Sequence, residues 1–209
     1  MAVSANLFAN FLDQAASGNI NWASDSIKMA LLTSSASPNL ATWVHYSDLT
    51  NEVAAGGGYS TGGVALGTKT HTVTAANSWG TSRANTTSQN VGDIVKPASS
   101  NGYIYECVVA GTTGSSLPTY PTQQGNTVAD GTVTWSCIGE SITQWSSAAA
   151  QWTSATISAQ YGVIYDAQSG TGTTEPLICL INFGSTVTST SGNFTVTPAT
   201  NGWFWLAPQ

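Results

Sequence analysis

Side chains that could do chemistry are few in this sequence and follow no recognisable pattern. There are two histidines, His45 and His71, and ten carboxylates scattered along the chain. Asp48 follows His45 closely, but in a segment that we expect to be a loop, so this spacing alone does not make a catalytic pair. No G-x-S-x-G sequence is present to hold a nucleophilic serine, and a glycosidase pair of carboxylates cannot be identified from spacing. We therefore expect that the protein is not an enzyme.

The three cysteines do not indicate a metal site. Cys107, Cys137 and Cys179 lack the C-x-x-C spacing typical of zinc ligands, and we expect neither a metal nor a cofactor. Cys107 and Cys137 fall in two predicted strands and could be cross-strand neighbours. They would be small buried thiols, or a disulfide if the protein met an oxidising medium. Cys179 falls in the most apolar predicted strand and should be buried.

The glycine-rich stretch Gly56–Gly63 invites a comparison with phosphate-binding loops. Such a loop follows a strand and opens a helix, whose N-terminus holds the anion. Here no strand is predicted before the stretch, a strand-like run follows it, and no lysine is nearby. The sequence therefore does not predict a nucleotide site.

The composition is that of a β protein with an unusually uncharged surface. Only 7% of the residues are charged, against about 25% in ordinary soluble proteins. The chain holds 56 serines and threonines but only 14 charged residues, so hydroxyls and amides must supply most of its surface polarity. Thr, Val, Tyr and Trp favour strands, and 21 glycines supply turns. The content of apolar residues, 41%, is ample for packed cores.

The charge balance excludes some partners. The net charge is −6, and the four fixed cations are not clustered, whereas nucleic-acid binding needs clustered Lys and Arg. The first basic residue is Lys28, so the basic start of a signal peptide is missing, and no apolar run approaches membrane-spanning length. We expect a protein made in a cytosol, with neither nucleic acid nor a membrane as partner.

One helix is expected, from Ser4 as N-cap to Ser17, with Gly18 as its stop. Its apolar face, which includes Phe8 and Phe11, would dock on a sheet or contact a neighbouring subunit. Most of the remaining chain alternates as strands do. The expected strands are Ser26–Thr33, Val64–Leu66, Thr70–Thr74, Thr156–Asp166, Leu177–Phe183, Asn193–Thr197 and Trp203–Leu206.

Two of these strands carry specific expectations. Leu177–Phe183 is apolar on both faces, so it should be a central, doubly covered strand. Thr156–Asp166 alternates, and we expect one face to hold Ile157, Ala159, Tyr161, Val163 and Tyr165.

The middle of the chain reads as an inserted module. Between Val91 and Ile138, three short alternating runs separated by turn dipeptides predict a small antiparallel sheet. The predicted fold is therefore mainly β: a β-sandwich of residues 1–77 and 141–209 with one N-terminal helix, interrupted by an antiparallel β module of residues 78–140. Insertions of this kind occur at exposed loop tips.

Both parts carry a resemblance. Residues 1–77 and 143–209 resemble a family of tailed-bacteriophage virion proteins through the motifs Ile27–Ser34, Ser47–Asp48 with Asn51–Val53, Gly58–Gly63, Ala159–Tyr165 and Leu180–Gly184. The inserted stretch resembles a small β module recurrent in phage structural proteins, distantly similar to chitin-binding modules, through Val91–Val95, Asn101–Tyr105, Gly111–Gly114 and Asp130–Trp135.

The resemblance implies a non-enzymatic role on the virion surface. The expected protein is a capsid decoration or cement protein, which bridges subunits of the major capsid protein and forms a homo-oligomer, for example a trimer. The alternative is a tail-fibre or adhesion protein whose module binds host-surface glycan. The loop that follows Cys107 in this chain has no aromatic residue, which weakens the glycan hypothesis.

Aromatic residues are the candidate contact residues under both hypotheses. Because charges are scarce, contacts should rest on apolar and backbone groups. The candidates for subunit or capsid contacts are Phe8, Phe11, Trp43, Tyr46, Trp203, Phe204 and Trp205. The candidates for a glycan platform are Tyr103, Tyr105, Tyr120 and Trp135.

Overall fold

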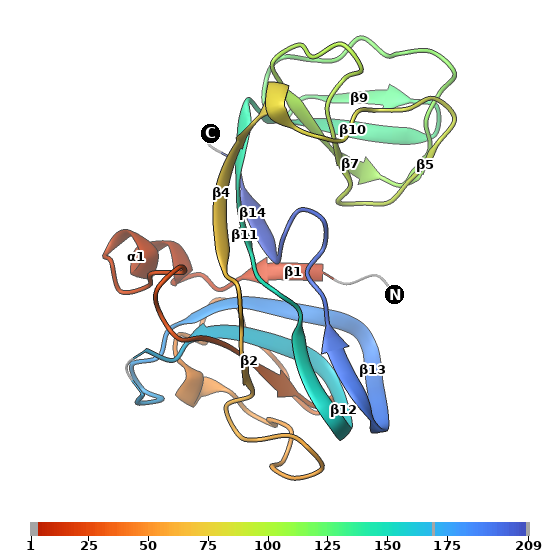
Figure 1. Ribbon diagram of the computed structural model, residues 1–209. Coiled ribbons are helices and arrows are strands. Elements are labelled where there is room, and N and C mark those ends of the chain that lie inside the picture. Colours follow the sequence, from red (N-terminus) through yellow and green to blue (C-terminus); the bar gives the residue numbers. More distant parts are fainter. Residues whose placement is uncertain (1–3, 169, 208–209) are drawn as a thin grey trace. The chain divides into compact units, whose positions relative to one another are not determined.

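The structure is a computed structural model that describes residues 4–168 and 170–207 (Figure 1). Within these residues it has fourteen strands and one α-helix, so the prediction of a mainly β protein with antiparallel sheets and one helix is confirmed. The chain divides into two compact units. Unit 1 comes from residues 1–71 and 145–204, and unit 2 from residues 72–144 and 205–209.

The elements follow this division. Unit 1 contains β1 Ser4–Leu7, α1 Phe11–Ala16, β2 Ile27–Leu32, the 3-10 turn η1 Tyr46–Asp48, β3 Val64–Ala65, β12 Ala150–Asp166 and β13 Leu177–Val196. Unit 2 contains the 3-10 turn η2 Ala76–Ser78, β5 Ser88–Gln89, β6 Ile94–Val95, β7 Ile104–Val109, β8 Gly111–Thr112, β9 Thr127–Asp130 and β10 Val133–Gly139. The chain passes between the units within β4 Thr70–Ala75, β11 Ser141–Ser146 and β14 Phe204–Leu206, which form a three-stranded sheet in the order β14-β11-β4.

Unit 1 is built on one antiparallel sheet of order β1-β13-β12-β2-β3. β13 lies between β1 and β12 over Cys179–Asn182, so the prediction of a central strand at Leu177–Phe183 is confirmed. β12 and β13 are much longer than their neighbours, and they run side by side as a curved ribbon beyond the rest of the sheet (Figure 1).

A hydrophobic core packs on each face of this sheet. The first core holds Ile27, Met29 and Leu31 of β2, and the second holds Ala30 and Leu32. This alternation is the one that the sequence predicts for Ser26–Thr33. The first core is completed by residues from α1, from the ribbon and from the end of the unit: Phe11, Trp152, Ile157, Phe183, Phe194, Trp203 and Phe204. The second is covered by the loop of residues 33–49, whose Leu40, Trp43, Tyr46 and Leu49 pack against it.

The predicted single face of β12 is wrong beyond Ala159. Ile157 and Ala159 belong to the first core, whereas Val163 and Tyr165 belong to the second. The ladder between β12 and β13 shifts register between Ala159 and Tyr161. Here two steps along β12 are matched by five along β13. The regular alternation of β12 is broken at this irregularity, and the side chains that follow face the opposite core.

The predicted helix over Ser4–Ser17 is also wrong in its first half. Ser4–Leu7 is strand β1, and the helix covers only Phe11–Ala16. The pairing of β1 with Asn182–Cys179 of β13 outweighs the local helical pattern. The stop is as predicted: Ser17 is the C-cap, and Gly18 follows with φ of 75°.

The glycine-rich stretch has a packing role. A Cβ at Gly63, where φ is 72°, would overlap the carbonyl oxygen of Met29. A Cβ at Gly58 would lie 2.9 Å from the Cα of Ala155. The backbone N–H of Thr156 donates to the carbonyl oxygen of Gly57 at 2.7 Å. These glycines therefore let the loop approach β2 and β12 at backbone distance.

Unit 2 contains an antiparallel sheet of order β6-β7-β10-β9 and a short pair formed by β5 and β8. The predicted small antiparallel sheet between Val91 and Ile138 is present. Residues 78–140, the expected insertion, all lie in this unit. Residues 72–77, 141–144 and 205–209 lie in it too, although we assigned them to the larger domain.

Candidate attachment surface

Four of the seven candidate contact residues are buried. Phe8 lies in the second core, and Phe11, Trp203 and Phe204 lie in the first. The rings of Phe11 and Phe204 meet edge to face, with centroids 5.2 Å apart. The candidates with exposed area are Trp43 and Tyr46, which half-cover the second core, and Trp205, which is half-buried in unit 2.

The four glycan candidates do not form an open aromatic platform. Tyr105 and Trp135 are fully buried in a core of unit 2, and Tyr103 and Tyr120 are half-buried against it. The Tyr105 hydroxyl donates to the carbonyl oxygen of Pro121 at 2.7 Å. The rings of Tyr105 and Tyr120 lie 4.5 Å apart. Sequence reasoning could not separate core aromatics from exposed ones, because both kinds alternate in the same strands.

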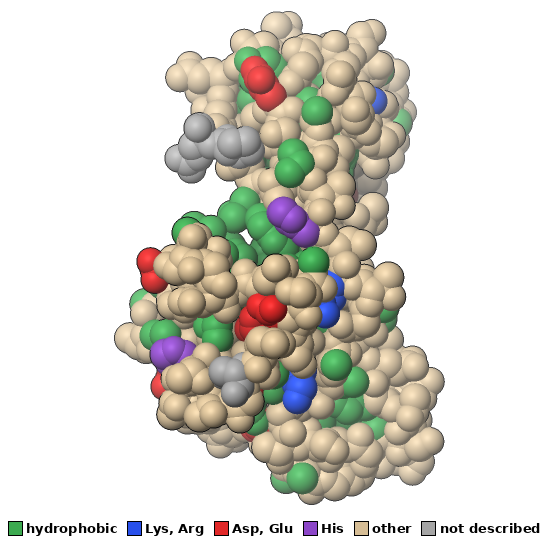
Figure 2. All heavy atoms as spheres, turned by 60° about the vertical axis from the view of Figure 1, so that its left-hand side comes forward, with side chains coloured by type: hydrophobic (Ala, Val, Ile, Leu, Met, Phe, Trp, Pro, Cys, Tyr) green, Lys and Arg blue, Asp and Glu red, His purple; other side chains and the backbone are tan. Residues whose placement is uncertain are grey.

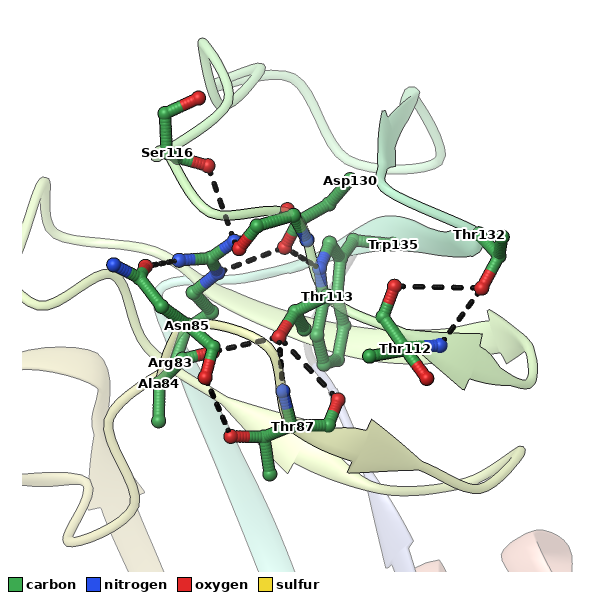
Figure 3. Close-up of polar contacts among 11 residues, drawn as sticks. Arg83, Ala84, Asn85, Thr87, Thr112, Thr113, Ser116, Asp130, Thr132 and Trp135 are labelled. Atoms are coloured by element: carbon green, nitrogen blue, oxygen red, sulfur yellow. Dashed lines mark hydrogen bonds and ion pairs between the residues drawn. The ribbon is translucent and has the colours of Figure 1, made fainter.

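Arg83 and Asp130 form a buried ion pair in unit 2 (Figure 3). Asp130 also accepts from the indole N–H of Trp135 at 2.9 Å and from the backbone N–H of Gly114 at 2.9 Å. Burial alone would raise the pKa of Asp130, but the Arg83 and Trp135 hydrogen bonds hold this pKa below its ordinary value. With its charge and hydrogen bonds satisfied, the cluster acts as a structural clamp between separated loops.

A second polar cluster lies in unit 1 around Glu52. Its carboxylate accepts from the hydroxyls of Tyr46 and Tyr59, both at 2.6 Å, and from the backbone N–H of Gly62 at 2.7 Å. The pKa values of both tyrosines are raised, first by burial and then by the Glu52 hydrogen bond. Tyr46 also stacks on Tyr165, with ring centroids 4.7 Å apart. These phenols remain protonated and tie the glycine-rich loop to the sheet.

A cluster of carboxylates surrounds the end of β12. Asp166 is buried, and its Oδ1 accepts from the backbone N–H of Gln168 at 2.8 Å, while no hydrogen-bond donor in the described residues reaches its Oδ2. Burial, together with the nearby carboxylates of Asp25 and Glu175, raises the pKa of Asp166 to about 7. Burial raises the pKa of Glu175 as well, whereas the nearby positive charge of Lys28 lowers it.

The cysteines lie where the sequence puts them, in strands. All three are buried, and none of them is in a disulfide. Cys107 on β7 is opposite Trp135, and Cys137 on β10 is opposite Tyr105. The two thiols are therefore diagonal neighbours on adjacent strands, a relation in which the Cα atoms are about 7–8 Å apart, beyond the usual reach of a disulfide.

A pocket of about 520 Å³ opens on unit 2 beside Trp205. It is lined by residues from three places in the sequence: Gln124, Gly125, Ser136, Cys137, Ile138, Trp205, Leu206 and Ala207. None of these side chains is charged. The amide nitrogen of Gln124 donates to the carbonyl oxygen of Ile138 at 3.2 Å, which fixes this wall. Sequence reasoning grouped Trp205 with the subunit contacts and missed Gln124 and Ser136, because nothing local links residues so far apart.

Two further observations concern the described residues only. No group of three or more His, Cys, Asp and Glu side chains among them is placed to hold a metal ion. None of their helices has the length and apolar character needed to cross a membrane.

An extended uncharged surface belongs to the β12–β13 ribbon. No Asp, Glu, Lys, Arg or His occurs in residues 141–165 or 176–209. One face of the ribbon carries Trp152, Ile157 and Phe194 into the first core. The other, which we call the hydroxyl face, exposes Gln151, Thr153, Thr156, Ser158, Thr186, Thr188, Thr190 and Thr195. Charged side chains are also few and isolated on the face of the molecule drawn in Figure 2.

Hydrogen bonds between side chains and backbone hold the ribbon in shape. Ser158 lies opposite Thr188 in the ladder, and the Gln151 amide nitrogen donates to the Thr195 hydroxyl at 3.0 Å. The Ser189 hydroxyl donates to the carbonyl oxygen of Ala155 at 2.9 Å and accepts from the backbone N–H of Ile157 at 3.3 Å. Ser189 thereby fills the irregular part of the ladder, and the hydroxyl face beside it is a preformed surface.

Comparisons of the chain with protein-family models, with curated proteins and with solved structures found no match.

Proposed function

We propose that this protein is a non-enzymatic structural protein of a phage virion, most simply a capsid decoration protein that binds the major capsid protein on the virion surface as a homo-oligomer. The proposal starts from the ordered motifs that resemble phage virion proteins. The structural observation that carries it is the hydroxyl face of the β12–β13 ribbon, an extended surface without charges. A face of this kind suits attachment through hydrogen bonds and close packing rather than through ion pairs.

The balance of energies favours such an attachment. Exposed ion pairs contribute little, about 0–1 kcal/mol each, and salt screens them. Hydroxyls that align with backbone groups of a partner contribute about 0.5–1.5 kcal/mol per hydrogen bond, and a stable interface needs roughly 1,000 Å² or more of complementary surface. The partly exposed Trp43 and Tyr46 of unit 1 can add apolar area to such an interface.

The experiment is to add the purified protein to particles that lack it and to measure binding as sodium chloride rises to molar levels. Binding should persist, because screening weakens only the charged terms. It should also survive deletion of residues 78–140. The Ser158→Lys variant, which places a charge on the hydroxyl face, should bind at least tenfold more weakly. The matched Thr119→Lys variant changes an exposed threonine of unit 2 and should bind as the unchanged protein does. Release by salt alone, or equal binding by both variants, would contradict the proposal.

The Trp205 pocket favours a second candidate, an adhesion protein whose unit 2 binds host-surface glycan. Sugar rings pack their apolar faces on indoles, and a neutral sugar needs hydroxyl and amide partners rather than charges. The pocket offers Trp205, Gln124 and Ser136 for these roles, and its volume lies within the range of small-ligand sites, about 300–1,000 Å³. Trp205→Ala should abolish binding on a glycan array and leave attachment to particles unchanged. Loss of particle attachment with no glycan signal from the parent protein would reject this candidate.

A further inference from the structure

One backbone edge of the ribbon has no partner strand among the residues that the structure describes. Among the described residues, β1 pairs with β13 over Cys179–Asn182, and the opposite edge of β13 pairs with β12 as far as Val196. Over Thr186–Thr190, no strand in the described part of the chain pairs with the outer edge of β13. In a strand, alternate residues direct their N–H and C=O groups to each side. This stretch therefore presents unpaired backbone groups at the margin of the main sheet.

The edge lacks the residue types that normally prevent strand pairing. Proteins protect exposed edges with lysines, prolines, inward-pointing charges or bulges. Thr186–Thr190 contains none of these residues. Its limits are set by Gly184, with φ of 78°, and Ser191, with φ of 48°. Between these limits, Val187–Ser189 pair with β12 in unbroken register, and the ladder shifts register on both sides of them. The stretch consists of β-branched and hydroxyl residues, and β-branched residues pair well in sheets.

The sequence of this edge is nearly symmetric about Thr188. It reads Thr-Val-Thr-Ser-Thr. In an antiparallel pairing about a two-fold axis through Thr188, that residue would face its own copy, Thr186 would face Thr190 of the other copy, and Val187 would face Ser189. Cross-strand threonine pairs are favourable. A two-fold axis places each residue near its counterpart in the other copy, so a charged residue close to the axis would be repelled by a like charge. Residues 176–209 contain no charged residue, so this repulsion does not arise.

We propose that two copies of this protein associate through the β13 edges, antiparallel and centred on Thr188, so that the two main sheets become one continuous sheet. The interface is isologous, with the same strand used by both copies. It concerns the protein in solution and does not rest on attachment to a particle. Because five residues a side bury less than a standard interface, the dimer should be weak. A particle surface that holds neighbouring copies would strengthen it through effective concentration.

Charge exchange at the axis tests this arrangement. Thr188 is exposed, so Thr188→Lys and Thr188→Glu should each fold, but each places like charges face to face in the dimer. Sedimentation of the unchanged protein up to the millimolar range should show a monomer–dimer equilibrium. Each variant alone should dimerise at least tenfold more weakly, and an equimolar mixture of the two should recover the association. Ser158→Lys is the matched control: Ser158 lies opposite Thr188 on the same face but one strand away from the edge, and this variant should dimerise normally.

An introduced cysteine gives a second readout. All three native cysteines are buried, so Thr188→Cys adds the one exposed thiol in the described residues. Directly opposed residues of antiparallel strands have Cα atoms about 4.5–5.5 Å apart, within the range of a disulfide. Thr188→Cys should therefore form a covalent dimer under mild oxidation, whereas Ser158→Cys should not. A monomer at all concentrations, a trimer, or mixing of the charged variants without recovered association would overturn the proposal. The proposal would also be overturned if this edge bound a strand of a different protein and did not pair with a second copy of itself.

Discussion

Arg83 and Asp130 are 47 positions apart and form a two-pronged ion pair, in which Nε of Arg83 donates to Oδ2 of Asp130 at 2.8 Å and Nη2 donates to Oδ1 at 2.5 Å. Both side chains are buried. The same guanidinium donates to the carbonyl oxygens of Gly114 and Ser116 at 2.7 and 3.1 Å. One arginine therefore orders a loop that has little regular structure of its own.

Asp130→Asn should destabilise unit 2 strongly. The substitution keeps the size of the side chain but leaves the Arg83 charge buried without a counter-charge. Breaking a buried pair in this way costs about 3–5 kcal/mol. Hydrogen exchange followed by mass spectrometry should show reduced protection in β7 and β10, with β12 and β13 unchanged. Asp13→Asn, at an exposed position of α1, is the control, and equal effects of the two substitutions would contradict a structural role for the clamp.

The mainly β class and several of the strands could be predicted because their signals are local. The alternation of Ile27–Leu32, the doubly apolar run of Leu177–Phe183 and the turn dipeptides around β7 and β10 each reflect the period of a strand and the burial of its faces. The errors lie where a distant partner decides. Ser4–Leu7 became a strand by pairing with β13, and the faces of β12 reverse where its ladder with β13 shifts register after Ala159.

Excision of residues 78–140 should leave a cooperatively folding protein. All members of the first and second cores lie outside this range. The ends to be joined are close, because the Ala76 N–H donates to the carbonyl oxygen of Glu140 at 2.7 Å. A short Gly-Ser linker should therefore suffice, and calorimetry should show a single thermal transition.

The excision uncovers Ile142 and Trp205, which pack in a core of unit 2. A second variant that also carries Ile142→Ser and Trp205→Ser removes this new apolar surface and serves as the control for aggregation. If neither variant unfolds cooperatively, unit 2 is integral to the folding of unit 1, and an autonomous insertion is ruled out.

The native protein should react slowly with thiol reagents at all three cysteines. Cys179 is fully buried in β13, and burial raises the pKa values of Cys107, Cys137 and Cys179, so little reactive thiolate is present. Labelling followed by peptide mapping should find modification only on the time scale of local opening. The protein should also remain free of the Cys107–Cys137 disulfide after air oxidation. Rapid labelling of Cys179 would be incompatible with its central-strand position.

The candidate surfaces were harder to predict than the fold. Aromatic type alone does not distinguish Trp205, which lines a pocket, from Trp203, which lies in a core two residues away. The hydroxyl face could not be identified either, because it appears only when Ser158 and Thr188 are placed opposite each other. The scarcity of charged residues was visible in the sequence. That the uncharged segments form one continuous surface became clear only when β12 and β13 were seen to pair.

The contribution of Asp166 to the stability of unit 1 should fall as pH rises from about 4 to about 7. An aspartate in an unfolded chain has a pKa of about 3.9, whereas burial and the neighbouring carboxylates of Asp25 and Glu175 raise the pKa of Asp166 to about 7. Between these values the folded state binds one more proton than the unfolded state. Stability is therefore fully present below the unfolded pKa and declines by about 1.4 kcal/mol per pH unit until the folded pKa is passed.

Asp166→Asn should remove this dependence. The Asn carbonyl can still accept from the Gln168 N–H, and the neutral amide carries no charge to be repelled by Asp25 and Glu175. Urea unfolding at pH 4 to 8 should show the variant gaining stability over the unchanged protein as pH rises. Subtracting the two curves cancels the contributions of Asp48 and Asp130, whose lowered pKa values act in the opposite sense and are lost only as pH falls. Asp13→Asn should leave the curve unchanged in shape. A constant difference between the Asp166→Asn variant and the unchanged protein across this range would show that Asp166 carries no proton in the folded state.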